Sequence, residues 1–278
     1  MSYISQFVGY FSSPKGYIQR TYQLRSQYLN RKVRLSIYRP GVSPNQPIKL
    51  LLCLDGQDFP RMHLSEHLKS FGTSEQGLFL LVGIHAADRM REYGTADRLD
   101  YKGRGDQSRA HQDFITEELL PWLSSRYHLE ENSSSRAIIG FSLGGLHAFD
   151  LAWRCSDTFG SVGVFSGALW WRSKPFLKKK PDANRIVHDY VTSTIAIPRN
   201  LRIWLMAGTK DEEEDRNSNG IIDAIDDTIQ LQALLEKRGF TAPERLTYHE
   251  EEGGRHEPET WGKVLPQFLE WWLWGKGG

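Results

Sequence analysis

The chain contains few cysteines. Its 278 residues include only 2, Cys53 and Cys155, too few for the disulfide framework that holds small secreted domains together. Cys53 lies in the apolar run KLLLCL, where a thiol behaves as a small buried hydrophobic side chain. We therefore expect two free thiols and a cytoplasmic location.

Net charge and long apolar runs are also lacking. The 35 Lys and Arg residues nearly balance the 34 Asp and Glu residues, for a formal net charge of +1. This balance gives no general electrostatic attraction to nucleic acid or to an acidic membrane surface. No segment reaches the roughly 20 apolar residues of a membrane span, and residues 1–17 lack the basic start and apolar core of a signal peptide. We expect neither nucleic acid nor a membrane as a partner, and the sequence indicates no oligomeric state.

Aromatic residues, in contrast, are abundant, with 9 Trp, 13 Phe and 11 Tyr. They are spread along the chain, which excludes a disordered or fibrous protein and provides for a sizeable core. No internal repeat, low-complexity segment or linker interrupts the sequence. We therefore expect a single domain over residues 1–278.

Strand patterns alternate with helical periods. Residues 17–24 and 33–38 alternate apolar and polar side chains, as half-exposed strands do, whereas residues 48–54 and 78–84 are continuous apolar runs, as in strands covered on both faces. Further strands are predicted at 137–139, 162–165, 201–206 and 246–248, and helices at 114–123, 143–153, 225–238 and 261–274. This order predicts an α/β fold in which a mixed, mostly parallel sheet carries helices on both faces, in three layers.

Two segments depart from this regular pattern. Pro121 interrupts the first predicted helix, which we expect it to end or bend, because proline lacks the N–H group and its ring clashes with the preceding turn. Residues 169–200 contain no clean strand and could form a small cap over the sheet.

The sequence Gly140-Phe141-Ser142-Leu143-Gly144-Gly145 carries the strongest chemical signal. It follows a predicted strand and opens a predicted helix, the context of the G-x-S-x-G nucleophile elbow. The glycines let strand and helix approach closely, and the tight turn lifts the serine hydroxyl above the sheet. The alternative is a small-residue turn that only packs the helix onto the sheet. We interpret Ser142 as a nucleophile.

A serine hydroxyl needs a general base, and in α/β-hydrolases an acid and then a histidine follow the serine along the chain. Only His188, His249 and His256 lie far enough downstream of Ser142. His188 falls in the expected cap and His249 in a predicted strand. His256 lies in the loop between the last strand and the last helix, where a base can reach the elbow. We therefore predict His256 as the base.

The acid that orients the histidine should follow the strand at 201–206. Four acidic residues occur there in succession, Asp211, Glu212, Glu213 and Glu214. A run of charges is usually a solvated face, so the other three are expected to be solvated or to serve elsewhere. Composition does not choose among them.

Together these motifs resemble the esterase D / enterochelin esterase-like family of α/β-hydrolases, from Arg34 to Trp272. The matching pieces are LDGQD at 54–58, REY at 91–93, Phe114 with ELLP at 118–121, GFSLGG at 140–145, FSGALWW at 165–171, GTKD at 208–211, and GRH at 254–256 with Trp261. The resemblance implies the α/β-hydrolase fold, with Ser142 as nucleophile, Asp211 as acid and His256 as base. The family's G-T-x-D motif favours Asp211 over Glu212, whereas G-R-H departs from the commoner G-G-H.

An ester hydrolase also needs two backbone N–H groups aimed at the developing oxyanion. The amide of Leu143, directly after the nucleophile, should be one of them. By resemblance the other is the amide of Gln57, in the turn Asp55-Gly56-Gln57. Without the elbow, Asp55-Gly56 would be taken as an ordinary turn signal.

A separate motif follows the acidic run. Residues 215–226 match the calcium-loop pattern D-x-N-x-N-G-x-I-D-x-x-D. The predicted ligands are the side chains of Asp215, Asn217, Asn219, Asp223 and Asp226 and the carbonyl of Ile221. Position 12 is Asp rather than Glu, a strand rather than a helix precedes the loop, and cytosolic Ca²⁺ is low. The alternative is an Asx-rich turn that caps a helix at Asp226 or Asp227. A bound Ca²⁺ would be structural and would rigidify the segment that holds Asp211.

Trp170 and Trp171 adjoin the expected cap, together with Arg172 and the run Lys178-Lys179-Lys180. Aromatic walls and cations suit an anionic, catechol-bearing ester, although core tryptophans beside a solvated basic turn would give the same pattern.

The sequence thus predicts a serine carboxylic-ester hydrolase that needs no cofactor for catalysis. Its partner would be a small-molecule ester, of the enterochelin type or a carbohydrate acyl ester. The alternatives are an acyltransferase of the mycolyltransferase type and a catalytically silent binding protein on the same fold.

Overall fold

The computed structural model describes residues 16–41, 46–71, 78–241, 243 and 245–275. Most of the N-terminal segment that shows no signal-peptide pattern lies outside these residues. The strands are β1 (Tyr17–Ser26), β2 (Arg31–Pro40), β3 (Lys49–Leu54), β4 (Phe79–Ile84), β5 (Arg136–Phe141), β6 (Ser161–Phe165), β7 (Arg202–Lys210) and β8 (Leu246–Arg255). Within the described residues they form one 8-stranded sheet, in the order β1-β2-β4-β3-β5-β6-β7-β8.

The sheet is mixed, as predicted. β2 pairs antiparallel with both β1 and β4, whereas the pairs from β4 through β3, β5, β6 and β7 to β8 are parallel. The two alternating segments therefore form the antiparallel side, and the continuous apolar runs form the buried centre, where β3 and β4 are almost entirely covered.

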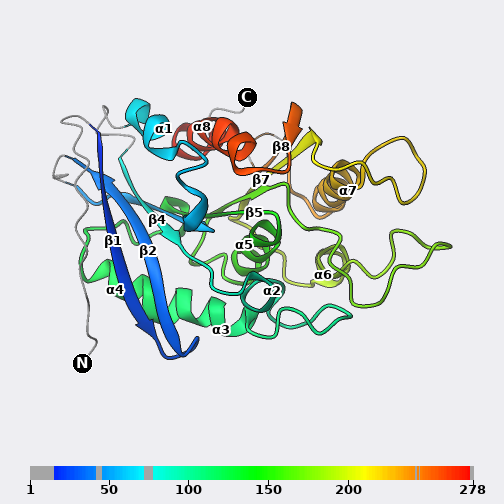
Figure 1. The fold of residues 1–278 in the computed structure, drawn as a ribbon, viewed down its shortest axis with the longest axis horizontal. Coiled ribbons are helices and arrows are strands. Elements are labelled where there is room, and N and C mark those ends of the chain that lie inside the picture. Colours follow the sequence, from blue (N-terminus) through cyan, green and yellow to red (C-terminus); the bar gives the residue numbers. More distant parts are fainter. Residues whose placement is uncertain (1–15, 42–45, 72–77, 242, 244, 276–278) are drawn as a thin grey trace.

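Helices cover both faces of the sheet (Figure 1). They are α1 (Leu64–Phe71), α2 (Arg89–Glu92), α3 (Ser108–Asp113), α4 (Leu120–Ser124), α5 (Leu143–Arg154), α6 (Ile186–Ser193), α7 (Asp223–Lys237) and α8 (Pro258–Trp274), with the short turns η1 (Gly56–Asp58), η3 (Phe114–Leu119) and η4 (Ser133–Ser135). One core cluster packs α1 and α8 against the sheet. The other packs α4, α5, α6 and α7 against the opposite face. The predicted three-layer α/β architecture is confirmed.

Pro121 does not end the helix, which was one of its two predicted effects. Helix α3, the π-helical turn η3 and α4 follow one another from Ser108 to Ser124. The N–H of Leu120 donates to the carbonyl of Ile115, five residues back, so the turn before Pro121 is wider than an α-helical one. Pro121 then lies in the first turn of α4, where its missing N–H costs little.

The segment at 169–200 contains a loop followed by α6, and it contacts the loop that precedes α7. Figure 1 shows both loops projecting from the same side of the molecule, next to α6 and α7. The guanidinium of Arg216 joins them through hydrogen bonds to Asp182, with Nη2 at 2.7 Å and Nε at 3.0 Å from Oδ1. The two loops therefore support each other.

The parallel strands bring the predicted chemical residues to one edge of the sheet. Asp55 follows β3, Ser142 follows β5, Asp211 follows β7 and His256 follows β8. The carboxyl ends of parallel strands lie at the same edge, where ligands bind in open α/β sheets. Among the described residues, no helix is both long and apolar enough to cross a membrane.

Candidate active site

Ser142 occupies a sharp turn between β5 and α5. Its φ of 55° and ψ of −121° lie in a region that a non-glycine residue rarely adopts, at a cost of about 1–3 kcal/mol. Close packing holds it there, because a Cβ added to Gly140 would lie 2.2 Å from the carbonyl oxygen of Gly144. This is the strained strand-to-helix geometry that the nucleophile elbow requires.

Hydrogen bonds fix the elbow to the next strand. The N–H of Ser142 donates to the carbonyl of Phe165 at 2.9 Å, and the N–H of Ala168 donates to the carbonyl of Ser142 at 2.9 Å. The N–H of Ser166 in turn donates to the carbonyl of Met206 in β7 at 2.8 Å. The ends of β5, β6 and β7 are therefore held in one rigid row.

Asp211 and His256 lie together at the ends of β7 and β8. Nδ1 of His256 is 3.9 Å from Oδ1 of Asp211, whose side chain is fully buried. The other oxygen of Asp211 accepts the N–H of Gly208 at 3.0 Å, whereas Oδ1 has no hydrogen-bond partner among the described residues. That oxygen is thus free for the imidazole, which needs to move by less than 1 Å to form a hydrogen bond.

The protonation of this pair suits a general base. Burial lowers the pKa of His256 and the Arg89 guanidinium lowers it further, although the Asp211 carboxylate opposes both. Burial raises the pKa of Asp211, against the Gly208 amide, Ser166 and His256. A histidine with a lowered pKa is neutral at neutral pH, and only the neutral form can accept a proton.

The other acids of the run are placed differently. Burial raises the pKa of Glu212 to about 7, and Glu213 and Glu214 are exposed. Of these four acids, Asp211 is the one whose carboxylate lies beside the His256 imidazole. The geometry therefore favours Asp211 over Glu212, in agreement with the family motif.

Trp261 and Ser166 also belong to this site, although sequence reasoning assigned neither a role. The indole N–H of Trp261 donates to the Ser166 hydroxyl at 3.0 Å, and Ser166 is adjacent to Asp211, whose pKa it helps to lower. Both residues lie within the pieces that carry the family resemblance. They are far apart in the sequence, however, and their spacing does not predict that they are in contact.

The predicted oxyanion amides begin two helical turns. Gln57 lies in η1 directly after β3, and Leu143 is the first residue of α5. N–H groups in the first turn of a helix have no carbonyl partner within that helix, so they can bind an anion. Both residues follow the carboxyl ends of neighbouring parallel strands, β3 and β5, and so lie at the same edge of the sheet as Ser142.

The two predicted substrate-binding tryptophans differ in exposure. Trp170 is 41% exposed, whereas Trp171 is fully buried. The guanidinium of Arg104 lies over both rings, 4.6 Å from the Trp171 centroid and 5.5 Å from that of Trp170. Trp170 is therefore available to a ligand, whereas Trp171 is a buried neighbour that packs beside it.

In the predicted calcium loop, backbone N–H groups donate hydrogen bonds to several of the side-chain oxygens that were predicted to bind Ca²⁺. The carboxylate of Asp215 accepts the N–H groups of Asn219 and Gly220 at 3.1 and 2.8 Å. The Asn217 and Asn219 side-chain oxygens accept backbone N–H groups at 3.2 and 2.8 Å. In the part of the chain that the structure describes, no group of three His, Cys, Asp or Glu residues is arranged to hold a metal.

Arg216, at position 2 of this loop, is buried rather than solvated. It pairs with Asp223 at 3.1 Å and with Asp227 at 2.6 Å, and its side chain is only 7% exposed. Asp226 lies 3.7 Å away. The guanidinium therefore already neutralises part of the loop's negative charge, and calcium binding stays a prediction.

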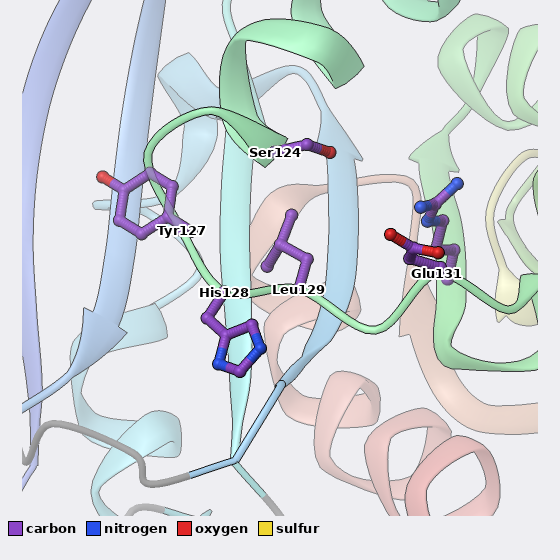
Figure 2. Close-up of a pocket in the computed structure, with 6 residues that line it drawn as sticks. Ser124, Tyr127, His128, Leu129 and Glu131 are labelled. Atoms are coloured by element: carbon purple, nitrogen blue, oxygen red, sulfur yellow. The ribbon is translucent and has the colours of Figure 1, made fainter.

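Two pockets lie away from the catalytic edge. One, of about 420 Å³, is lined by Ser124, Tyr127, His128, Leu129, Glu131 and Arg136 (Figure 2). Arg136 is the first residue of β5, so this pocket lies at the amino ends of the parallel strands. The other, of about 400 Å³, lies between the loop after α2 and helices α5 and α6. Neither contains a predicted catalytic residue.

Comparison with known proteins identifies the family. Residues 26–272 match the family model described as "Putative esterase". The chain belongs to this esterase family. The esterase is 26% identical over 190 residues to the iron(III) salmochelin esterase of Escherichia coli O6:H1, covering 65% of this chain and 42% of that protein.

Two solved structures show the same fold. A ferulic acid esterase superposes with a TM-score of 0.70 at 19% identity, covering 94% of the esterase and 99% of that chain. The enterobactin esterase FES of Shigella flexneri superposes with a TM-score of 0.71 at 22% identity, covering 92% of the esterase and 59% of that chain. The α/β-hydrolase fold is confirmed, and the esterase is a carboxylic-ester hydrolase.

Proposed function

We propose that the esterase cleaves its substrate through an acyl-enzyme on Ser142. His256 accepts the proton of the Ser142 hydroxyl as its oxygen attacks the ester carbonyl. Asp211 holds the imidazole and stabilises its charged form. The tetrahedral intermediate then collapses, and the alcohol leaves with the proton that His256 carries.

A water molecule completes the cycle. It attacks the acyl-enzyme while His256 removes its proton, and the acid is released as Ser142 recovers its hydrogen. During both attacks the amides of Leu143 and Gln57 donate to the negative oxygen. No metal or organic cofactor takes part in this proposal.

The contact between Asp211 and His256 is the observation that carries this proposal. It brings together a buried carboxylate and a half-exposed imidazole from the ends of two strands, in the row that also contains the strained Ser142. A silent binding protein would have no use for backbone strain at a serine beside such a pair. Strain of this kind is concentrated at functional sites.

For the substrate we propose an ester with an aromatic or anionic acyl group, of the enterochelin type, with a carbohydrate acyl ester as the second choice. The exposed ring of Trp170 supports this choice, and Arg104, which stacks on that ring, already pairs with Asp100. Trp170 lies in the segment that follows Ala168, whose N–H contacts the Ser142 carbonyl. The names of the salmochelin, enterobactin and ferulic acid esterases point the same way.

The decisive experiment compares the esterase with its Ser142→Ala variant. We expect kcat for short p-nitrophenyl esters to fall by roughly 10⁴-fold or more, with an unchanged melting temperature. A fluorophosphonate should label the wild type and not the variant. Wild-type turnover by the folded variant would contradict the mechanism.

A panel of feruloyl, acetyl-sugar and catecholate-lactone esters then ranks the substrates. The alternative of acyl transfer to a sugar hydroxyl is tested by adding a sugar acceptor. Formation of acyl-sugar in preference to free acid would identify a transferase of the mycolyltransferase type. Failure to react with any ester or with the fluorophosphonate would indicate a silent binding protein.

A further inference from the structure

Arg89 links two turns that are distant in the sequence. It is the first residue of α2, and its guanidinium reaches the end of β3, where Nε and Nη2 donate to Oδ1 and Oδ2 of Asp55 at 2.9 and 3.1 Å. The same Nη2 donates to the carbonyl of Phe141 at 3.2 Å. Phe141 immediately precedes Ser142, so one side chain contacts both the oxyanion turn and the elbow.

Asp55 is the centre of this arrangement. It is fully buried, and its φ of 60° places it in the left-handed region. Its N–H donates to the hydroxyl of Tyr93 at 3.2 Å, and its carboxylate accepts the side-chain N–H of Gln57 at 2.7 Å. The backbone around the predicted oxyanion amide of Gln57 is therefore held by the Asp55 side chain.

The Asp55 carboxylate also packs against the elbow. A Cβ added to Gly144 would lie 2.8 Å from Oδ2 of Asp55, so a glycine is needed there for the carboxylate to fit. β3 and β5 are adjacent parallel strands, with Cys53 opposite Ile139. Extending this register by two residues places Asp55 opposite Phe141, and these are the two residues that Arg89 binds.

We propose that Arg89 and Asp55 form a brace that sets the spacing of the Gln57 and Leu143 amides. This inference rests on the proposed function. Arg89 and Asp55 are positioning residues, because they act on the oxyanion through the two turns that carry the amides. The oxyanion hole needs donors held about 2.7–3.1 Å from the oxyanion, and loss of the brace lets the turns separate.

The geometry requires an arginine. Its planar fork presents parallel N–H groups to both carboxylate oxygens and has a further direction for the Phe141 carbonyl, whereas lysine is a compact point charge that cannot span the three acceptors. Arg89→Lys therefore removes the brace and keeps the positive charge that Arg89 places near His256. The charge effect on the base is thus separated from the effect on geometry.

The same helix provides a matched control. Arg91 also forms a forked ion pair through Nε and Nη2, with Asp106, but both side chains are largely exposed. Arg91→Lys makes the same chemical change two residues away without touching β3 or the elbow. We expect Arg91→Lys to behave as the wild type in every assay described below.

The assay compares an aryl ester with its thionoester, in which sulfur replaces the carbonyl oxygen. Sulfur is a weak hydrogen-bond acceptor, so an intact oxyanion hole strongly prefers the oxygen ester. We expect Arg89→Lys to lower kcat for the oxygen ester by about 10–10³-fold, with KM little changed, the upper end matching the loss of one whole oxyanion donor. The ratio of kcat for the oxygen ester to kcat for the thionoester should also decrease in Arg89→Lys. Rates are normalised to sites titrated with a fluorophosphonate, so that unfolded enzyme is not counted.

Asp55→Asn provides a second, independent break in the brace. Because both residues act as one unit, the Arg89→Lys/Asp55→Asn double variant should lose no more than about the larger single effect. Equal kcat in Arg89→Lys and Arg91→Lys would overturn the proposal, and so would a lower kcat with an unchanged oxygen preference. If Ser142→Ala is inactive, either of these results rejects only the brace. If Ser142→Ala is active, the proposed function itself is rejected.

Discussion

The imidazole of His256 meets the indole of Trp261 edge to face, with ring centroids 5.3 Å apart and planes at 84°. Trp261 is 5% exposed and stacks on Phe141, so it cannot turn freely. The position of the proposed base is therefore set by the packing of α8 as well as by Asp211.

Trp261→Phe should impair turnover more than binding. The smaller ring leaves space beside His256, and the hydrogen bond to Ser166, worth about 0.5–1.5 kcal/mol, is lost. We expect kcat for p-nitrophenyl acetate to fall by about 10-fold, because small misplacements of a catalytic group are costly. Trp274→Phe is the control, since Trp274 lies in α8 but is 42% exposed and packs on Phe71. Equal kcat in both variants would contradict the role of Trp261.

Asp211→Asn should separate the proposed acid from its neighbours. The amide cannot stabilise the positively charged imidazole, so kcat should fall by about 10²–10⁴-fold. Glu213→Gln and Glu214→Gln should be nearly silent because both side chains are exposed. Steady-state kinetics of the single variants test this. If Glu212→Gln is the damaging change instead, the acid has been assigned one residue too early.

The esterase should keep its activity to a lower pH than an ordinary histidine base would allow, as seen in the acid limb of the kcat/KM profile. His256 must be neutral to accept a proton, so activity is lost as the pH drops through its pKa. Burial and Arg89 lower that pKa, so the midpoint should lie below the 6.5 of an ordinary histidine. In Asp211→Asn the midpoint of the residual activity should move lower still, since Asp211 favours the charged form. A wild-type midpoint above 6.5 would contradict the described environment of His256.

Acid should also destabilise the fold through buried histidines. His111 and His147 are fully buried and hydrogen-bonded to each other, 3.0 Å between Nδ1 and Nε2. Burial lowers the pKa of His147 to about 4. Below pH 6.5 His147 binds a proton in the unfolded chain but stays neutral in the folded chain. The free energy of unfolding therefore decreases as the pH is lowered. For His147 the loss at pH 5 is about 2 kcal/mol.

Urea unfolding at pH 7 and pH 5 measures this loss. His147→Gln should reduce the difference in unfolding free energy between the two pH values by about 2 kcal/mol, whatever its effect at pH 7. His63→Gln, at an exposed histidine, is the control variant. The same pH dependence in His147→Gln and the wild type would show that this histidine is protonated in the folded state.

For the loop at 215–226 we propose a structural Ca²⁺ site. Ca²⁺ that binds only the folded state should raise the melting temperature as its concentration increases. The gain should disappear in Asp215→Ala, which lacks the first ligand, and persist in Glu213→Ala. Chelation should reduce stability more than activity. A melting curve that is the same in millimolar Ca²⁺ and in excess chelator, with no metal found by elemental analysis, would leave the loop as a turn closed by Arg216.

The sequence predicted those features that depend on local spacing. Ser142 was identifiable because its glycines and the flanking strand and helix lie within a few residues of it, and the same holds for the apolar runs of β3 and β4. His256 was selected by chain order and by its loop. The family motif chose Asp211, and composition alone could not have separated it from Glu212.

What the sequence did not reveal depends on contacts between distant residues. Arg89 looks like one of many surface arginines until β3, α2 and β5 are brought together. Arg216 occupies a position to which the calcium-loop motif gives no role, yet four nearby acids make its burial favourable. Pro121 does not end its helix because a π turn, which has no sequence signature, precedes it and leaves the proline in a first turn. In each case the deciding partner lies in another element or in a hydrogen-bond pattern.

The contact between Arg216 and Asp182 limits how this esterase can be re-engineered. The loop of Asp182 follows Trp170, the exposed ring proposed to face the acyl group, and the loop of Arg216 follows the proposed catalytic acid Asp211. A graft that replaces only the first loop to alter substrate preference would remove one of the carboxylates that pair with the buried Arg216 guanidinium, in the loop that follows Asp211. The contact therefore links the loop proposed to bind the acyl group with the loop that follows the catalytic acid. A graft should exchange the two loops as a pair.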